Sequence, residues 1–302
     1  MEFANHANQA DSGADIAYTL RSRGVEVITP QLSPSTAQHE GWCFPDSEEG
    51  IYSAVTQGAT HLWANTIVFS SHPLQTASCL DSYAPTLRVV GQPPGLVEKF
   101  DDKMYLNDKL RQQGNFTLPQ SWVVNEGDDL EVLLQSIPNY PVVGKPLKSH
   151  IKSLFRESPV VLLEEFLSGE EATITVMPPS LDRAEYWSMP PVARFNHDQG
   201  IAPYNGTVAV TANSRVVTKE EMRDQSYEVV MRQCEEVASL IKATAPIRID
   251  NMTGPGRPGR EDQASLTAMA AAGCGWDYPT LLQNIFHGAS TLETFRQYRA
   301  HL

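Results

Sequence analysis

Residues 160–177, VVLLEEFLSGEEATITVM, limit the fold of this chain more than any other stretch. Two apolar runs are separated by a short turn, Leu167–Gly169, so the pattern predicts two β-strands. Four glutamates flank the turn: Glu164, Glu165, Glu170 and Glu171. Acidic residues are depleted in strands, and a carboxylate is rarely buried without a partner. The stretch therefore indicates either a binding role for these carboxylates or an exposed hairpin.

Length and charge narrow the class of protein. The chain has 302 residues, 41% of them hydrophobic, and a formal net charge of −13 from 23 basic and 36 acidic side chains. A chain of this size usually forms two or three domains. Its negative charge, without a basic stripe of interleaved aromatics, argues against a nucleic-acid partner. We interpret the acidity itself as an aid to solubility.

The sequence also predicts the compartment. No apolar run approaches the ~18–20 residues needed to cross a bilayer, so we expect no membrane partner. Residues 1–15 are polar and lack the apolar core of a secretory signal. The four cysteines are scattered and form no metal-ligand cluster, which predicts reduced thiols in a cytoplasmic protein.

Strands and helices alternate along the first hundred residues. We expect helices over 11–23 and 47–57, and strands over 25–30, 60–69 and 87–91. This alternation is typical of a parallel sheet covered by helices. The sequence therefore predicts an α/β chain that opens with a Rossmann-like domain, although no strand precedes the first helix.

The rest of the chain mixes helices with antiparallel strands. A helix over 100–114 begins on aspartates and ends at Gly114, and a strand over 140–146 ends in a lysine. The stretch 186–216 alternates like an antiparallel sheet. A long amphipathic helix over 218–244 is predicted to have Thr218 as its N-cap.

Two lysines and a strand end are spaced in a way that suits a nucleotide. Lys103, at the start of a helix, and Lys145, at the end of a strand, can reach one anion from two sides. The strand that ends at Glu164–Leu167 offers backbone N–H and C=O groups to the edge of a purine, and its last two side chains can cover the ring. Glu171 can accept both hydroxyls of a ribose. Taken singly, each lysine is more typical of a solvated surface.

Two charged residues near the end of the chain suggest reaction chemistry. Asp250 follows a short strand and can hold Mg²⁺, which prefers carboxylate oxygen. Arg248, two residues earlier, shares the same strand face. A fixed guanidinium there suits a carboxylate or a developing oxyanion. The alternative is that Arg248 and Asp250 form a structural ion pair.

Taken in order, these residues resemble the ATP-grasp superfamily, and within it the D-alanine–D-alanine ligase branch. The resemblance covers nearly the whole chain and is sharpest in five segments: FDDKMYLNDKL with GNFTLPQSW, YPVVGKP, VVLLEEFLSGEEATITVM, PIRID, and NMTGPG with EDQASL. It implies a Rossmann-like pre-ATP-grasp substrate domain over 1–94 and an ATP-grasp fold whose two subdomains, 95–170 and 171–302, clamp ATP.

The resemblance also implies site residues and cofactors. Arg248 would be catalytic, stabilising the reacting carbonyl, and Asp250 would bind Mg²⁺ (or Mn²⁺). The expected ATP-binding residues are Lys103, Lys145, Glu164, Glu165, Phe166, Leu167 and Glu171. Lys103 and Lys145 would touch the phosphates, 164–167 the adenine and Glu171 the ribose. Glu165, like Glu170, has the alternative of simple solvation.

Four further positions are candidate substrate contacts, three by the same resemblance and one from its own loop sequence. Ser265 and Leu266 fall where the family places contacts to the second substrate, and His72 where related ligases carry a histidine. A loop histidine without a role is the alternative for His72. Gly254 belongs to GPGRPG, which formally matches a dinucleotide fingerprint, but only helices follow. We interpret that segment as an anion-facing substrate loop or a plain connector.

The sequence departs from the family pattern at several points. No glycine-rich loop follows Lys145, and the strand that should complete the metal site after Asp250 is missing. The first domain lacks its opening strand, and no third phosphate-side lysine occurs near GIAPYNG. Either the printed sequence omits loops, which predicts chain breaks at 147–153 and 250–251, or the chain is a deletion variant.

The implied activity is ATP-dependent joining of a small-molecule carboxylate to an amine, through an acyl phosphate and with release of ADP and phosphate. The alternative within this fold is a catalytically degenerate nucleotide-binding protein. An ATP-grasp phosphotransferase or carboxylase is a rival among enzymes. We expect small-molecule partners only, and a homodimer stays open as the assembly.

Overall fold

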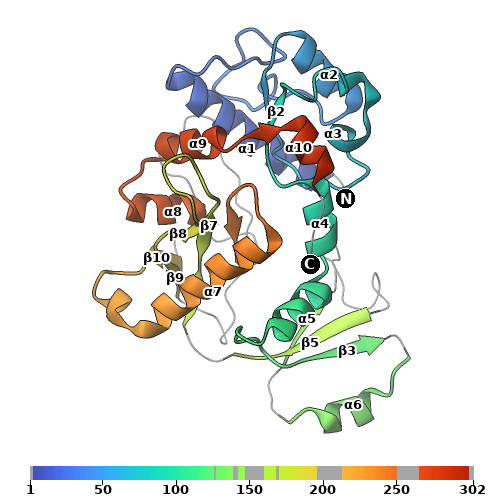
Figure 1. Cartoon of the computed structure of the whole chain (residues 1–302), viewed down its shortest axis with the longest axis vertical. Helices are drawn as coiled ribbons and strands as arrows, with labels where there is room; N and C mark the ends of the chain where they lie inside the picture. The colour runs from blue at the N-terminus through green and yellow to red at the C-terminus, as the bar shows by residue number, and fades with distance from the viewer. Residues whose placement is uncertain are drawn as a thin grey trace. The chain divides into compact units, whose positions relative to one another are not determined.

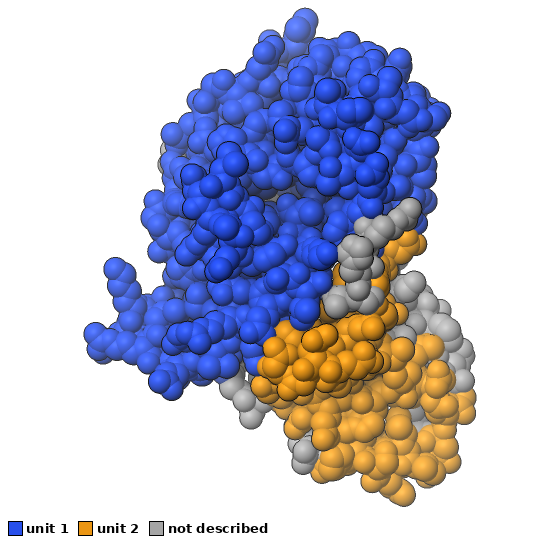
Figure 2. Space-filling model, in the orientation of Figure 1, with its two compact units in different colours: residues 1–97, 170–301 blue, residues 98–169, 302 orange. Residues whose placement is uncertain are grey.

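The computed structural model describes residues 3–125, 127–138, 142–146, 160–167, 170–195, 213–249 and 265–298. The chain forms two compact units, which Figure 2 shows in different colours. Unit 1 comprises residues 1–97 and 170–301, and unit 2 comprises 98–169 with residue 302. Among the described residues, no helix is both long enough and apolar enough to span a membrane.

The first sheet of unit 1 joins the two ends of the chain. Its order is β1-β2-β12, with β1 and β2 parallel and β12 antiparallel to β2. The elements of this part are α1 (Phe3–Ser22), α2 (Glu48–Thr56), β1 (His61–Trp63), α3 (Pro73–Thr76), β2 (Arg88–Val90), β12 (Ser290–Thr291) and α10 (Leu292–Gln297). Figure 1 shows α10 beside β2. The helix and strand predictions for 47–57 and 87–91 are confirmed.

A shared core holds these elements together. Leu292 and Phe295 of α10 are buried with Val89 of β2 and Leu74 of α3. Arg296 donates to the carbonyl oxygens of Leu74 and Ala77 at 2.6 and 2.8 Å, which satisfies acceptors at the end of α3. The C-terminal helix is therefore built into the N-terminal core.

The predicted strand over 25–30 is wrong. In this fully described stretch the backbone pairs with no strand. Arg21 of α1 donates from Nη2 to the carbonyl oxygen of Val27 and to Thr29 Oγ1, both at 2.9 Å. A side chain thus satisfies an acceptor that a neighbouring strand would use. The Rossmann-like topology stays a prediction.

Two antiparallel sheets form the rest of unit 1. Their orders are β10-β9-β6 and β11-β7-β8. Their strands are β6 (Glu171–Thr173), β7 (Thr175–Met177), β8 (Trp187–Ser188), β9 (Val192–Arg194), β10 (Ser214–Val216) and β11 (Ile247–Arg248), and their helices are α7 (Gln225–Ile241), α8 (Leu266–Gly273) and α9 (Tyr278–His287). Met177, Met189, Leu266 and Leu281 form part of their core.

The long helix of this region begins later than predicted. Asp224, not Thr218, is the N-cap of α7 and accepts from Ser226 N at 2.9 Å. Thr218 instead exchanges hydrogen bonds with Glu221, as in a capping box, and a short 3-10 turn follows. Two N-terminal signals lie close together here, and the second one starts the α-helix.

Unit 2 contains one antiparallel sheet with β5 at its centre, in the order β3-β5-β4. Its elements are α5 (Lys103–Gln113), β3 (Ser121–Asn125), α6 (Leu130–Ser136), β4 (Val142–Pro146) and β5 (Val160–Glu165), and α4 (Pro94–Phe100) leads into it. Val124, Val161 and Leu162 are buried. β5 pairs with β3 and with β4, whereas β6, the strand predicted after the turn, pairs with β9 in unit 1.

Candidate nucleotide and ligation site

Lys103 is the first residue of α5, as predicted. Asp102 caps this helix by accepting a hydrogen bond from Tyr105 N at 3.0 Å, and Gly114, at φ 79°, ends it in the left-handed conformation. The positive end of the helix dipole therefore coincides with a lysine, a combination that favours an anion. The assignment of Lys103 to the ATP phosphates stays a prediction.

The Glu164 carboxylate is buried and bonded within unit 2. Its residue lies on β5 opposite Ser121 and Val143 and is 5% exposed. Asn107 of α5 donates from Nδ2 to Glu164 Oε1 at 3.1 Å. A buried carboxylate needs partners of this kind, because an unpaired charge is costly to bury. The side chain of Glu164 is thus held by Asn107 of the same unit.

The end of β5 has backbone positions beyond the sheet, of the kind that the predicted adenine-binding segment, Glu164–Leu167, requires. The Glu165 N–H donates to the carbonyl oxygen of Gln120 at 2.9 Å, and its Oε2 accepts from Gln120 N at 3.5 Å. Phe166 and Leu167 follow the last ladder position, so their backbone groups lie beyond the sheet. Leu167 is 65% exposed and Phe166 is partly buried. Contact of this segment with adenine stays a prediction.

Lys145 occupies the next-to-last position of β4, in register with Leu162 of β5. Paired residues of an antiparallel ladder lie directly opposite one another. Lys145 therefore lies on the strand beside the one that carries Glu164–Leu167. Its place near a strand end is confirmed, and its contact with phosphate stays a prediction.

Glu171 begins β6 in unit 1 and has a partner that the sequence did not indicate. It lies opposite Arg194 of β9, and Arg194 Nη1 is 3.5 Å from Glu171 Oε1. The Arg194 side chain is 2% exposed and that of Glu171 is 35% exposed. The Glu171 carboxylate is thus already shared with a buried guanidinium, and its contact with a ribose stays a prediction. The alternative of an exposed, unpartnered hairpin does not hold for Glu171.

The neighbouring Glu170 is also more than a solvated charge. It is exposed, but it accepts a hydrogen bond from Tyr227 Oη of α7 at 2.8 Å. Burial and the hydrogen bond to Glu170 raise the pKa of Tyr227 to about 12. The two glutamates after the turn are thus each tied to a different element of unit 1, one to β9 and one to α7.

Arg248 and the start of α8 come together through two threonines. Arg248 of β11 lies opposite Thr175 of β7. Thr175 Oγ1 donates to Thr267 Oγ1 of α8 across a long 3.5 Å hydrogen bond. Ser265 is the N-cap residue of α8, and its side chain makes no capping hydrogen bond. Leu266 is fully buried in the core of this part, and the substrate contacts of Ser265 and Leu266 stay predictions, as does the catalytic role of Arg248.

His72 has a structural role in unit 1. It caps α3, where Nδ1 accepts from Leu74 N at 3.1 Å, and Nε2 lies 2.7 Å from Asp46 Oδ1. Because Nδ1 is an acceptor, the proton lies on Nε2 and is donated to Asp46. Both ring nitrogens are thus engaged within unit 1, and a substrate contact of His72 stays a prediction.

The predicted metal ligand Asp250 and the loop residue Gly254 lie outside the described residues. The stretches 147–153 and 250–251, where chain breaks were predicted, lie outside them as well. Within the described ranges there is no group of three or more His, Cys, Asp or Glu residues that could hold a metal ion. The Mg²⁺ site therefore stays a prediction.

The fold of this chain is similar to that of several solved structures. No protein-family model and no curated protein matches the chain. Among solved structures it is similar to the D-alanine–D-alanine ligase from Coxiella burnetii, with a TM-score of 0.52 and 12% identity over 80% of this chain and 71% of that chain. This likeness confirms the predicted resemblance to D-alanine–D-alanine ligases at the level of the fold alone.

Two further similar structures have lower TM-scores. The D-alanine–D-alanine ligase from Bacillus anthracis complexed with ATP has a TM-score of 0.49 and 16% identity, over 82% of this chain and 84% of that chain. The VanG D-Ala:D-Ser ligase from Enterococcus faecalis has a TM-score of 0.47 and 12% identity, over 70% of this chain and 67% of that chain. The fold assignment therefore depends on the likeness to the Coxiella burnetii ligase.

Proposed function

We propose that this chain is an ATP-dependent carboxylate–amine ligase that forms an amide through an acyl phosphate and releases ADP and phosphate. The fold likeness supports this proposal. The observation that carries it lies in unit 2, where the predicted phosphate and adenine residues fall on three elements of one compact body: Lys103 begins α5, Lys145 lies near the end of β4, and the adenine segment Glu164–Leu167 ends the adjacent β5.

The proposed reaction has two steps. A carboxylate oxygen of the acid attacks the γ-phosphorus of ATP and ADP leaves; the amine nitrogen then attacks the acyl carbon and phosphate leaves. Lys103 and Lys145 hold the phosphate oxygens, and Arg248 stabilises the negative charge that develops on the acyl oxygen. When bound at Asp250, Mg²⁺ (or Mn²⁺) would offset phosphate charge. No side chain acts as a covalent nucleophile in this scheme.

A catalytically degenerate nucleotide-binding protein is the second candidate. Two observations favour it: no glycine-rich loop follows Lys145 in the sequence, and Glu171 is already paired with Arg194. Such a protein would bind ATP through the same segments of unit 2 without turning it over.

The test is release of ADP from ATP by the full chain, with Mg²⁺ and a panel of amino acids and small carboxylic acids. A ligase turns over ATP repeatedly, with release of ADP and phosphate, when a matching acid and amine are both present. Binding of ATP without turnover across the panel would select the degenerate protein. The absence of ATP binding would contradict both candidates.

A further inference from the structure

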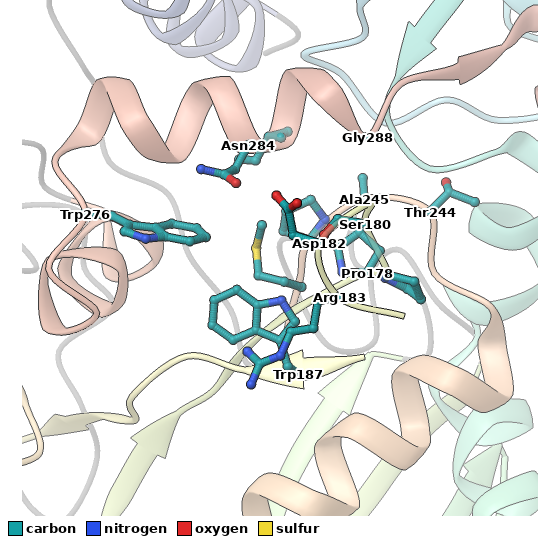
Figure 3. Close-up of a pocket in the computed structure, with 14 residues that line it drawn as sticks. Pro178, Ser180, Asp182, Arg183, Trp187, Thr244, Ala245, Trp276, Asn284 and Gly288 are labelled. Atoms are coloured by element: carbon teal, nitrogen blue, oxygen red, sulfur yellow. The ribbon is translucent and has the colours of Figure 1, made fainter. Parts of the chain in front are cut away.

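Unit 1 contains a pocket that the proposed ligase chemistry does not use. Its cavity volume is about 230 Å³, and it lies between the segment after β7, the start of β8, the loop before β11, and α9 (Figure 3). Among the described residues that line it, none is a candidate for nucleotide or substrate binding. Sites for drug-sized ligands enclose ~300–1,000 Å³, so this one suits a smaller group.

Two indole rings form one side of the pocket. The rings of Trp187 and Trp276 have centroids 5.5 Å apart and are nearly perpendicular, at 82°. The Arg183 guanidinium carbon lies 4.5 Å from the centre of the Trp187 ring. The face of an indole attracts cations, and Arg183 already uses one such face. The pocket wall therefore combines apolar indole surface with a guanidinium that is already stacked on Trp187, and Trp276 remains as the indole for a ligand.

Two oxygen acceptors face one another across the pocket. Asn284 of α9 donates from Nδ2 to the carbonyl oxygen of Thr280 at 2.8 Å, and this bond orients the amide. Figure 3 shows the Asn284 oxygen and the Asp182 carboxylate turned toward each other. Within the described part of the chain, no hydrogen bond involves either the Asp182 carboxylate or the Asn284 oxygen. A ligand with N–H donors can bridge them.

The backbone of the pocket also favours a donor-rich ligand. Pro178, Pro179 and Pro246 belong to its lining, and proline has no N–H to offer. An anion would find few backbone donors here, and Arg183 is stacked on Trp187. The net charge of −13 further raises the concentration of small cations near the protein.

We propose that this pocket binds a small organic cation, an alkylammonium or guanidinium group. Its N–H groups donate to the Asp182 carboxylate and the Asn284 oxygen, and its carbon chain packs against Trp276. The site does not depend on the ligase reaction, and its ligand is neither ATP nor a phosphate.

The test is a titration of the full chain with n-butylammonium chloride, followed by NMR of the indole N–H signals. Spectra of Trp187→Phe and Trp276→Phe assign the two signals. Butan-1-ol, which has the same chain without the charge, is the control ligand. We expect butylammonium to shift both signals with an affinity at least about tenfold higher than that of butanol. Equal affinities, no shift, or a larger response to sodium sulfate than to butylammonium would overturn the proposal.

Matched variants locate the charge that matters. Asp182→Asn keeps the shape of the side chain and should weaken butylammonium binding by about tenfold, because a charge-assisted hydrogen bond is lost. Glu185→Gln removes a nearby exposed charge that does not line the pocket, and it should leave binding unchanged. Asn284→Leu removes the second proposed acceptor, the Asn284 oxygen, and should also weaken butylammonium binding. Equal losses in Asp182→Asn and Glu185→Gln would mean general electrostatic attraction and overturn the site.

Discussion

The Asn107 side chain of α5 donates a hydrogen bond of 3.1 Å to the buried Glu164 carboxylate of β5. This contact ties the helix that begins at Lys103 to the strand that ends in the adenine segment. Asn107 follows Lys103 by one helical turn, so both project from the same face of α5. This hydrogen bond therefore couples the position of Lys103, a predicted phosphate-binding residue, to that of the predicted adenine-binding segment, Glu164–Leu167.

Replacing Asn107 tests this coupling. Asn107→Ala removes one hydrogen bond from a buried carboxylate, so we expect a loss of about 1–3 kcal/mol in the free energy of unfolding. Urea denaturation measures it. Gln112→Ala, at an exposed position of the same helix, is the control and should change the free energy of unfolding by less than ~0.5 kcal/mol. Similar losses in both variants would show that the bond to Glu164 has no special weight.

ATP binding should distinguish the roles of Lys145 and Glu171. Lys145→Ala should weaken ATP about tenfold or more and adenosine much less, because the lysine acts on phosphate. Glu171→Ala should weaken both ligands, because the carboxylate acts on ribose. Calorimetry measures the affinities, and Lys219→Ala, at an exposed position of unit 1, is the control for loss of a positive charge.

Glu171 needs a second variant because of its ion pair. Glu171→Ala also removes an acceptor from the buried Arg194 guanidinium, so its melting temperature must be compared with that of the parent chain. Glu171→Gln retains an acceptor for Arg194 and should be better folded. Equal ATP affinity in the parent, Lys145→Ala and Glu171→Ala proteins would refute the site assignment.

Local signals made some elements predictable from the sequence. The helix expected over 100–114 is α5, Lys103–Gln113, because an aspartate cap and a terminal glycine mark its ends. The placing of Lys103 and Lys145 at element ends follows from such signals. By contrast, β12 has two residues and pairs with β2 from the other end of the chain. A strand that short carries no periodicity from which to predict it.

The residues that hold charges in place were not predictable. Asn107 and Arg194 are the partners of Glu164 and Glu171, but their sequence separations are 57 and 23 residues. Nothing local distinguishes them from other polar residues, because tertiary packing decides which side chain meets a buried charge. The strand expected over 25–30 failed through a local contact instead, since Arg21, six residues before Val27, donates to the carbonyl oxygen of Val27.

The nucleotide product separates two classes of ligase chemistry. If the full chain turns over ATP, we expect ADP and phosphate, because the proposed first step transfers the γ-phosphoryl group to a carboxylate. Chromatography of the spent nucleotide identifies the product. Arg248→Met should bind ATP normally and lose turnover, since the arginine is assigned to the acyl oxygen. Accumulation of AMP and pyrophosphate would exclude the proposed mechanism.

The loss of folding stability between pH 4.5 and about pH 2 should include a contribution from Glu221. The Arg215 guanidinium donates to both oxygens of this carboxylate at 2.7 Å, and Thr218 N donates at 2.9 Å. These hydrogen bonds lower the pKa of Glu221 from 4.5 to about 2. Because the folded pKa is depressed, the stabilisation is fully present above pH 4.5 and is lost as the pH falls through about 2.

The measurement is the melting temperature of the parent chain and of Glu221→Gln between neutral pH and about pH 2, at low salt. The parent should melt higher above pH 4.5, and the difference should shrink as the pH approaches 2, because protonation removes the charge from Glu221. Added salt should reduce the difference at neutral pH, since the ion pair is exposed. Glu220→Gln, a change at the preceding exposed residue, should show no such pH dependence. A difference between parent and Glu221→Gln that is constant down to pH 2 would mean that the ion pair does not stabilise the fold.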